Sequence, residues 1–357
     1  MARSLNHEVV IIGGGSAGIA TASSMLKRRP SLDIAIVEPS EDHYYQPGWT
    51  MVGGGVFEAP ATRRTTASVM PKQATWLKQS AASFQPENNQ VTLSDGATIT
   101  YRLLIVAPGI RLAWEKIDGL EETLGKNGVT SNYRYDLAPY TWDLVRNLKS
   151  GRAIFSQPPM PIKCAGAPQK AMYLSCDAWM ERGVLDDIDV EFRNAGGVLF
   201  GVKEYVPALM EYVEKYGIDL KLNQTLVAVD GPSKKAVFKT EAGEETVEFD
   251  MLHAVPPQVA PQFVADSPLA QAESGFVDID PITLRHVRYP NVFGLGDAGS
   301  SPNAKTAAAV RKQAPIVAVN ALAVLDGKQP VADYDGYGSC PLTVERGKIV
   351  LAEFGYG

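Results

Sequence analysis

Two cysteines stand in segments where a thiol could carry out redox chemistry. Cys164 lies in IKCAGAPQK (162–170), just before an expected helix, and Cys340 lies in a Gly/Ser/Pro-punctuated segment that predicts an exposed loop. The dipole and N–H groups at a helix N-terminus lower the pKa of a thiol and make it more reactive. A free cysteine is most often a small buried hydrophobe. We nevertheless interpret Cys164 and Cys340 as a candidate redox pair from distant parts of the chain.

Cys176 falls within the helix that is expected to follow Cys164. The segment 171–183 has apolar residues at helical spacing and ends at Gly183. At a rise of ~1.5 Å per residue, an all-helical path would place Cys176 roughly 15 Å or more from Cys164. We interpret Cys176 as a buried structural thiol, and a redox role for a third cysteine stays open.

The elements that must position these thiols begin with a glycine motif near the N-terminus. Apolar strands are expected over 9–12 and 34–37, with a helix to about residue 27 between them. The motif G-x-G-x-x-G is formed by Gly13, Gly15 and Gly18. These glycines permit a tight turn, close approach of a pyrophosphate and close packing of helix on strand, while Glu38 can accept hydrogen bonds from a ribose. This context predicts a dinucleotide-binding unit.

Two later segments indicate that the dinucleotide is FAD. The apolar strand in YRLLIVAPGI (101–110) stops at Pro108-Gly109, which resembles an ATG-like motif of FAD-dependent disulfide-reductase-like proteins. YPNVFGLGDAGS (289–300) resembles their second FAD motif, and Asp297 is the candidate ligand of the ribitol chain. A helix is expected from near Lys305 and Thr306, where its positive N-terminal end favours an anionic reduced flavin.

A second nucleotide-binding unit is expected over 114–274, but its nucleotide site is predicted to be lost. The loop after the strand at 153–156 keeps one glycine, Gly166, and carries Pro168, which has no N–H to offer a phosphate. The next strand ends at Arg193 rather than at a carboxylate. Arg193 could suit NADP, but a glycine loop to accompany it is missing.

Four segments together resemble the sulfide:quinone oxidoreductases, in particular the type II branch that includes the mitochondrial enzyme. These segments are 42–55, 162–175, 289–310 and 334–342, and the resemblance covers nearly the whole chain. It implies an α/β fold with tandem Rossmann-like domains. We expect a discontinuous FAD-binding domain (1–113 and 275–320), a second Rossmann-like domain with Cys164 (114–274) and a C-terminal segment with Cys340 (321–357).

The motifs and the resemblance together predict the residues that bind FAD. They are Gly13, Gly15, Ser16, Ala17, Gly18, Glu38, Pro39, Gln46, Ala81, Ala107, Pro108, Gly109, Gly296, Asp297, Lys305 and Thr306. The resemblance also places Tyr45 and Trp49 near the flavin ring, with aromatic core packing as the alternative.

The resemblance implies oxidation of hydrogen sulfide through Cys164 and Cys340. Hydrosulfide attacks a bridge between the two cysteines, Cys340 carries the persulfide, and the sulfur at Cys164 faces the flavin. Electrons then pass to a quinone of the ubiquinone or menaquinone type, and sulfite, glutathione or another sulfide removes the sulfane sulfur.

Two alternatives stay open. One is an NAD(P)H-dependent flavoprotein, such as a type II NADH dehydrogenase or a coenzyme A disulfide reductase, which the degenerate loop disfavours. The other is the flavin subunit of a flavocytochrome c sulfide dehydrogenase, which the lack of a C-x-x-C-H motif and of a signal peptide disfavours.

Composition limits the partners. The net charge is −6 and there is no basic cluster, so nucleic acid is excluded as a partner. The four histidines show no metal-ligand spacing, so no metal is expected. His7 is expected on a frayed terminus. His253 is expected to pack or hydrogen-bond, with proton transfer near the flavin or quinone as the alternative. No apolar run approaches about 18 residues, so no membrane span is expected. The expected location is the cytoplasmic side of a bacterial inner membrane, held peripherally, with a homo-oligomer among the possible assemblies.

Overall fold

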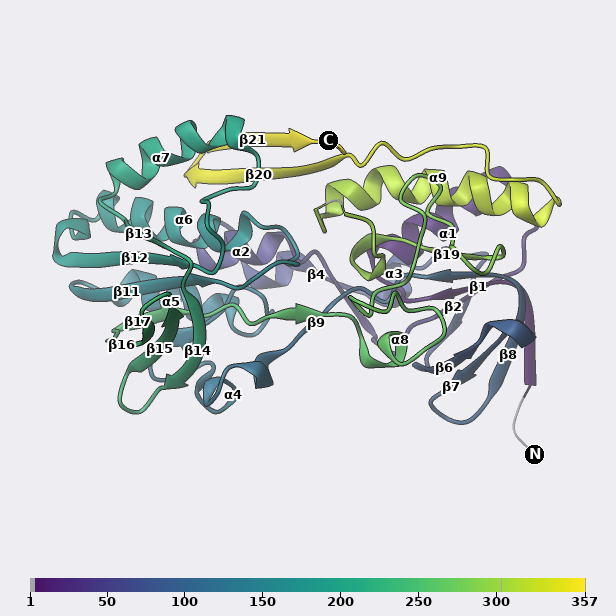
Figure 1. Cartoon of the computed structure of the whole chain (residues 1–357), viewed down its shortest axis with the longest axis horizontal. Coiled ribbons are helices and arrows are strands. Elements are labelled where there is room, and N and C mark those ends of the chain that lie inside the picture. Colours follow the sequence, from purple (N-terminus) through teal and green to yellow (C-terminus); the bar gives the residue numbers. More distant parts are fainter. Residues whose placement is uncertain (1–3, 303, 357) are drawn as a thin grey trace.

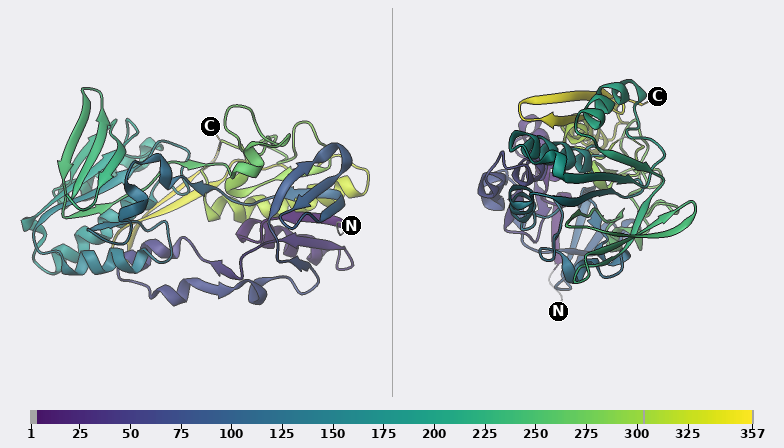
Figure 2. Two further views of the ribbon diagram at one scale, coloured as in Figure 1. Left: turned by 90° about the horizontal axis from the view of Figure 1, so that it is seen from below. Right: turned by 90° about the vertical axis from the view of Figure 1, so that its left-hand side faces the viewer.

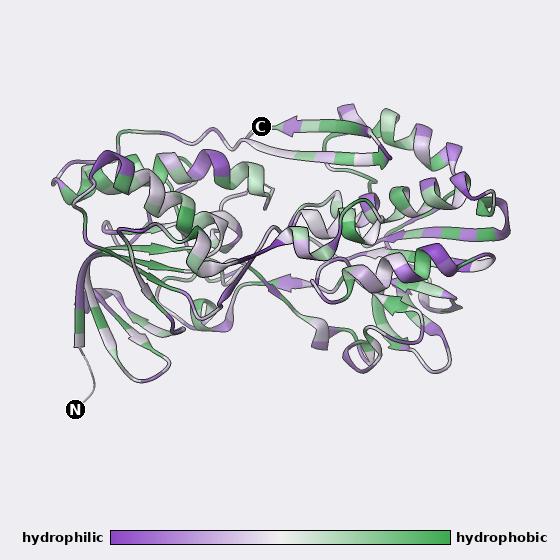
Figure 3. Ribbon diagram, turned by 180° about the vertical axis from the view of Figure 1, so that it is seen from behind, coloured by the Kyte–Doolittle hydropathy of each residue, from purple (hydrophilic) through white to green (hydrophobic). Residues whose placement is uncertain are grey.

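The computed structural model describes residues 4–302 and 304–356. It has two lobes that lie side by side along the longest axis (Figure 1). Apolar residues line the strands inside each lobe, and hydrophilic residues gather on outer helices and connections (Figure 3). Each lobe is built on its own sheet, and the α/β class expected from the sequence is confirmed.

The first lobe contains a seven-stranded sheet in the order β5-β2-β1-β8-β7-β6, with β19 paired to β8. Its central strands β1, β2 and β8 are parallel, and the residues 9–12 at the end of β1 are all buried. Strands that are buried on both faces read as continuous apolar runs, which is why the sequence located them. The bounds are β1 (Ser4–Ile12), β2 (Ile34–Val37), β5 (Thr75–Leu77), β6 (Ala81–Gln85), β7 (Gln90–Leu93), β8 (Thr98–Val106) and β19 (Val292–Gly294).

Helices α1 (Ser16–Arg28) and α9 (Ala307–Leu325) pack against each other on this lobe. Among residues 4–302 and 304–356, α9 is the one helix long and apolar enough to cross a membrane by length and composition alone. Its residues Val310, Ala314 and Val317 belong to the hydrophobic core of the lobe. A buried core helix also meets these criteria, and we describe α9 as such a helix.

The second lobe contains a five-stranded parallel sheet in the order β10-β17-β11-β12-β13. The strands are β10 (Val129–Thr130), β11 (Gly151–Gln157), β12 (Ile188–Asn194), β13 (Asp219–Leu222) and β17 (Met251–His253). Three helices accompany them: α5 (Ala138–Asn147), α6 (Ala167–Glu181) and α7 (Val206–Lys215). The strand and helix expected on either side of the Cys164 loop are therefore present as β11 and α6.

A three-stranded antiparallel sheet extends from the second lobe (Figure 2). It consists of β14 (Thr225–Asp230), β15 (Lys235–Thr240) and β16 (Gly243–Glu248). The chain crosses between the lobes where β9 (Arg111–Leu112) pairs with β18 (Gln258–Val259). Short elements complete the fold: β3 (Asp42–Tyr44), β4 (Arg63–Thr65), α2 (Gly48–Gly53), α3 (Thr66–Val69), α4 (Leu120–Thr123) and α8 (Gln262–Ala265).

The last hairpin, β20 (Gly338–Glu345) and β21 (Lys348–Phe354), returns the chain to the second lobe. After α9 the chain runs back along the molecule and places the hairpin beside α6 and α7 (Figure 1). The hydroxyl of Tyr216 donates to the carbonyl of Val344 at 2.9 Å and holds it there. The expectation of an exposed loop around Cys340 is wrong, because this residue lies within β20 and is 1% exposed.

Candidate active site

The glycine motif forms a cradle that fits a pyrophosphate. Gly13 has φ +101°, and a β-carbon added there would lie 2.3 Å from the carbonyl oxygen of Ala107. At Gly18 an added β-carbon would lie 1.9 Å from the carbonyl oxygen of Gly13. An added β-carbon at Gly15 would have no neighbour within 4 Å, and Gly15 precedes the first residue of α1, Ser16. The open N-terminus of α1 can therefore receive the phosphates of FAD.

Glu38 is held at the end of β2 by two backbone donors. Its carboxylate accepts hydrogen bonds from the N–H of Gly14 at 2.8 Å and from the N–H of Ser40 at 2.7 Å. Ala81 begins β6 shortly after Leu77, whose carbonyl accepts from the N–H of Glu38 at 3.0 Å. The predicted ribose ligand is thus fixed next to the glycine motif.

The second FAD motif is fastened to the start of α9 by a lysine. Nζ of Lys305 donates to the carbonyls of Asp297 and Gly299, each at 2.8 Å, and lies 4.1 Å from the ring centre of Phe276. Burial lowers the pKa of Lys305 to about 8 and raises the pKa of Asp297. Thr306 caps α9, since its Oγ1 accepts from the N–H of Ala309 at 3.1 Å.

The structure brings the two predicted cysteines together. The Sγ atoms of Cys164 and Cys340 are 2.9 Å apart, and both cysteines are free thiols. One comes from the loop before α6 and the other from β20, so the pair depends on the docking of the final hairpin. This contact is the hydrogen-bonded arrangement of a dithiol that can close to a disulfide.

The backbone of Cys164 is anchored to the segment that leads into α9. Its φ of +56° lies in the left-handed region, which is uncommon for a residue with a side chain. The N–H of Cys164 donates to the carbonyl of Lys305 at 2.8 Å, and its own carbonyl accepts from the N–H of Ala167 at 2.8 Å. The thiol loop of the second lobe is therefore tied to the second FAD motif of the first.

Gly166 makes room for a sulfur atom. A β-carbon added at Gly166 would lie 2.6 Å from Sγ of Cys340 and 2.7 Å from a side-chain carbon of Leu342. The one glycine left in this loop therefore lies directly against the second thiol.

The two thiols are electrostatically unequal. The hydrogen bond from Cys340 lowers the pKa of Cys164 to about 6, and the positive charge of Lys170 acts in the same direction against the effect of burial. The same hydrogen bond, together with burial, raises the pKa of Cys340. Nζ of Lys170 is 3.6 Å from Sγ of Cys164. Sequence reasoning missed Lys170, because a lysine in the first turns of a helix carries no signal of its own.

A second lysine bridges the lobes. Nζ of Lys163 donates to Oε1 of Gln46 at 2.7 Å, which places one predicted FAD contact beside the thiol loop. The carbonyl of Lys163 accepts from the buried hydroxyl of Tyr133 at 3.2 Å. Sequence reasoning missed Lys163 and Tyr133 as well, since their neighbours are distant in the sequence.

Cys176 is fully buried in the core of the second lobe, and burial raises its pKa. The interpretation of this residue as a buried thiol is confirmed. Burial likewise lowers the pKa of His253 to about 4, and its Nε2 accepts from the N–H of Asn132 at 2.9 Å, so His253 is a neutral structural residue. The expectation of a frayed terminus at His7 is wrong, since His7 lies in β1 and its Nδ1 is 2.9 Å from Oδ1 of Asp33.

Trp49 and Tyr45, the two aromatic residues that the resemblance places near the flavin ring, differ in burial. Trp49 is buried and packs against Tyr44 and Tyr135, which favours core packing. Tyr45 is 58% exposed. No group of histidine, cysteine or acidic residues suited to a metal ion occurs in the described ranges, 4–302 and 304–356.

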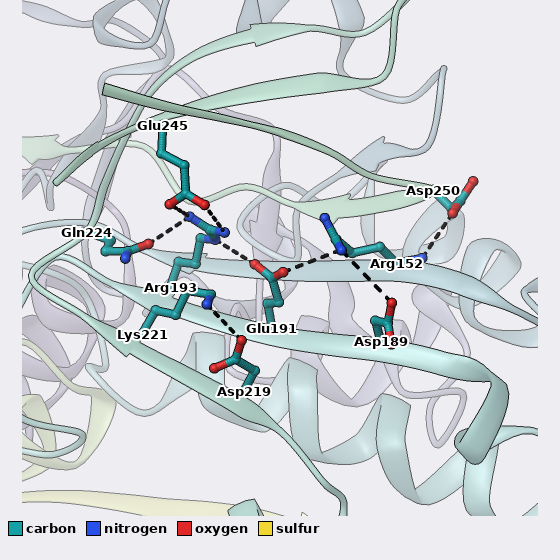
Figure 4. A network of polar contacts seen from close by, with 9 residues as sticks. All are labelled: Arg152, Asp189, Glu191, Arg193, Asp219, Lys221, Gln224, Glu245 and Asp250. Carbon is teal, nitrogen blue, oxygen red and sulfur yellow. Dashed lines mark hydrogen bonds and ion pairs between the residues drawn. The ribbon is translucent and has the colours of Figure 1, made fainter. Parts of the chain in front are cut away.

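Arg193 does not offer its guanidinium to a nucleotide phosphate. It is 1% exposed, its Nε is 2.7 Å from Oε2 of Glu191, and its Nη1 is 2.8 Å from Oε2 of Glu245 (Figure 4). The same Nη1 donates to Oε1 of Gln224 at 2.7 Å, and the guanidinium stacks on Phe238. These partners, which include residues of β12, β15 and β16, engage the whole guanidinium. This arrangement argues against binding of NADP.

The fold and the site define a flavin-dependent oxidoreductase with two Rossmann-like lobes and a dithiol at the second nucleotide position. The model of the family pyridine nucleotide-disulphide oxidoreductase matches residues 7–157. The mitochondrial sulfide:quinone oxidoreductase of Dictyostelium discoideum is 45% identical over 98% of this chain and 78% of its own length. The corresponding protein of Mus musculus is 40% identical over 98% and 78%. The chain belongs to the sulfide:quinone oxidoreductase family.

A solved structure supports the fold. The sulfide:quinone oxidoreductase of Aquifex aeolicus superposes with a TM-score of 0.84 at 20% identity, covering 99% of this chain and 87% of the other. Both curated relatives above are named as mitochondrial proteins. The expectation of a bacterial inner membrane is therefore not supported.

Proposed function

We propose that this chain is a sulfide:quinone oxidoreductase that uses FAD to oxidise hydrogen sulfide through Cys164 and Cys340. The observation that carries the proposal is the 2.9 Å contact between their Sγ atoms. Family membership and the anchoring of Cys164 to the second FAD motif add to it. The NAD(P)H-dependent alternative is disfavoured by the internal ion pairs of Arg193 and by Pro168 in the first turn of α6.

FAD would be held along the first lobe by the sixteen residues that the sequence analysis predicts as its ligands. The N-terminus of α1 and Glu38 would bind the adenosine diphosphate half, and the second motif with the start of α9 would bind the flavin half. Bound there, FAD would supply a two-electron acceptor for the dithiol and a two-electron donor for a quinone. Lys305 holds the carbonyls of Asp297 and Gly299 in place for this binding.

The thiol chemistry starts from a Cys164–Cys340 disulfide. Hydrosulfide forms a bond to Sγ of Cys340, the disulfide bond breaks, and its electron pair goes to Sγ of Cys164. A nucleophilic acceptor (sulfite, glutathione or a second sulfide) then takes the outer sulfur from Cys340. The remaining dithiol gives up two electrons and its protons to regenerate the disulfide.

The finer assignments belong to the same proposal. The electron acceptor is a quinone of the ubiquinone or menaquinone type, and the protein is held peripherally at a mitochondrial membrane. The residues 1–113 with 275–320 form the FAD-binding domain, 114–274 the second domain, and 321–357 the C-terminal segment. The separate sheets of the two lobes support this division.

An anaerobic titration tests the function. The purified protein with bound FAD is mixed with sulfide in one experiment and with NADH in another while the flavin spectrum is recorded. We expect sulfide to bleach the main flavin band, NADH to leave it unchanged, and a short-chain quinone to restore it. Bleaching by NADH alone would instead establish the pyridine-nucleotide alternative.

A further inference from the structure

Lys170 is a buried cation beside the thiol pair. Its side chain belongs to α6, the residue is 7% exposed, and Nζ lies 3.6 Å from Sγ of Cys164. Within the ranges 4–302 and 304–356, no carboxylate forms an ion pair with it. A buried ammonium without a counter-charge is strongly disfavoured, so a negative charge on the adjacent sulfur stabilises this arrangement.

Of the three neighbouring lysines, Lys170 is the one whose ammonium contacts a thiol of the Cys164–Cys340 pair, because the other two bind different partners. Nζ of Lys163 is engaged by Gln46, and Nζ of Lys305 is engaged by backbone carbonyls. The phenol of Tyr133 stays protonated because burial raises its pKa. Burial, the largest single effect, lowers the pKa of Lys170, but the interactions with Cys164 and Cys340, together with Tyr45, outweigh it and raise the pKa.

The lysine is placed asymmetrically. Its ammonium makes a 3.6 Å contact with Sγ of Cys164, whereas on Cys340 its charge lowers the pKa against the larger raising effects of the hydrogen bond with Cys164 and of burial. In thiol–disulfide exchange the sulfur whose thiol has the lower pKa leaves faster, and the nucleophile bonds to the other sulfur. The position of one ammonium group therefore sets which cysteine is attacked.

We propose that Lys170 directs hydrosulfide onto Cys340 by stabilising the electron pair released onto Sγ of Cys164. This inference rests on the proposed function. In the step, hydrosulfide forms a bond to Sγ of Cys340 and the Sγ–Sγ bond breaks. The products are a persulfide on Cys340 and a thiolate on Cys164 beside the ammonium. The sulfur of sulfide is oxidised and the disulfide is reduced by the same two electrons, so no other reactant is needed.

The first test titrates Cys164 in the reduced protein with FAD bound. Alkylation by iodoacetamide is followed by mass spectrometry of the peptide that contains Cys164, across pH 5 to 10. We expect half-maximal reactivity near the low pKa of the wild-type thiol. In Lys170→Met and Lys170→Gln the midpoint rises by about one unit or more, a tenfold slower reaction at low pH. Lys170→Arg keeps the low midpoint because it keeps the charge.

Lys163→Met is the matched control, because it removes a neighbouring cation whose Nζ binds Gln46 rather than sulfur. An equal midpoint in wild type and in both neutral Lys170 variants would overturn the proposal. So would an equal rise in Lys163→Met. The titration needs neither sulfide nor quinone, so its outcome is separate from that of the proposed function.

A second measurement locates the persulfide after one equivalent of sulfide is added to the oxidised protein. The wild type should carry the added sulfur on Cys340, and the neutral Lys170 variants should carry a mixture. A persulfide found on Cys164 in the wild type would contradict the proposed direction of attack. Failure of sulfide to react at all would contradict the proposed function, whereas the thiol titration would still report on Lys170.

Discussion

Gly166 lies directly against Cys340: a β-carbon added to this glycine would lie 2.6 Å from the sulfur. The backbone at Gly166 has φ −87°, which any residue can adopt, so space rather than backbone conformation requires the glycine. A glycine in this loop would usually allow a phosphate to approach the backbone. Here the space is taken by the second thiol.

Gly166→Ala should therefore separate the two sulfurs. The added methyl group also meets the buried side chain of Leu342, so the hairpin cannot simply yield. Displacement of reacting atoms by about 1 Å can lower a rate about 100-fold, and we expect flavin reduction by sulfide to slow by about tenfold or more. Stopped-flow absorbance measures this rate. Gly201→Ala is the control, since its added β-carbon has no neighbour within 4 Å. Equal rates in the two variants would refute the spatial role of Gly166.

Cys164→Ser and Cys340→Ser should each abolish reduction of the flavin by sulfide and leave FAD bound. Neither residue lies in the glycine motif or in the second FAD motif, so the absorbance ratio of flavin to protein should equal that of the wild type. Cys176→Ala is the control, because Cys176 is buried within α6 and the core of the second lobe. Normal bleaching in either serine variant would remove that cysteine from the mechanism.

The buried His253 should make the free energy of unfolding depend on pH. Burial lowers its pKa from 6.5 to about 4, so the unfolded chain binds a proton more readily between these values. The contribution of neutral His253 to the free energy of unfolding is complete above pH 6.5 and is lost as the pH falls toward 4. Its magnitude is about 3 kcal/mol. Urea unfolding at pH 7 and pH 4.5 tests this. The loss should be smaller in His253→Gln, and an identical loss in both proteins would assign the acid sensitivity to other groups.

Replacing Arg193 should lower the free energy of unfolding and should not change nucleotide binding. Arg193→Met breaks the buried pair with Glu191 and the pair with Glu245, whose side chain is exposed (Figure 4). Loss of one partner of a buried pair costs about 3 kcal/mol, and the buried carboxylate of Glu191 would keep its 3.4 Å contact with Arg152. Arg146→Met should cost less than about 1 kcal/mol, because its pair with Asp143 is exposed. Urea denaturation compares the variants. A drop in NADPH affinity in Arg193→Met would show that the wild-type site binds this nucleotide after all.

The local parts of the fold could be read from the sequence. The strand–glycine–helix unit from residue 9 to residue 37 has apolar periodicity and turn residues within one contiguous segment. Its boundaries agree closely with α1, β2 and the end of β1, although β1 begins earlier, at Ser4. Pro168 and the loss of glycines likewise marked the second nucleotide loop as degenerate. In both places the physical cause, a backbone conformation or a missing N–H, belongs to neighbouring residues.

Only the tertiary structure decided how the thiols meet. The segment around Cys340 reads as a loop because of its Gly, Ser and Pro residues, yet pairing with β21 and packing against α6 make it a buried strand. The charge on Lys170 and the hydrogen bond from Cys340 set the acidity of Cys164, and both come from side chains brought near by packing. The sequence by itself determined which residues could do the chemistry. The difference in pKa between Cys164 and Cys340 arises from long-range contacts, because electrostatic effects depend on distances in space rather than along the chain.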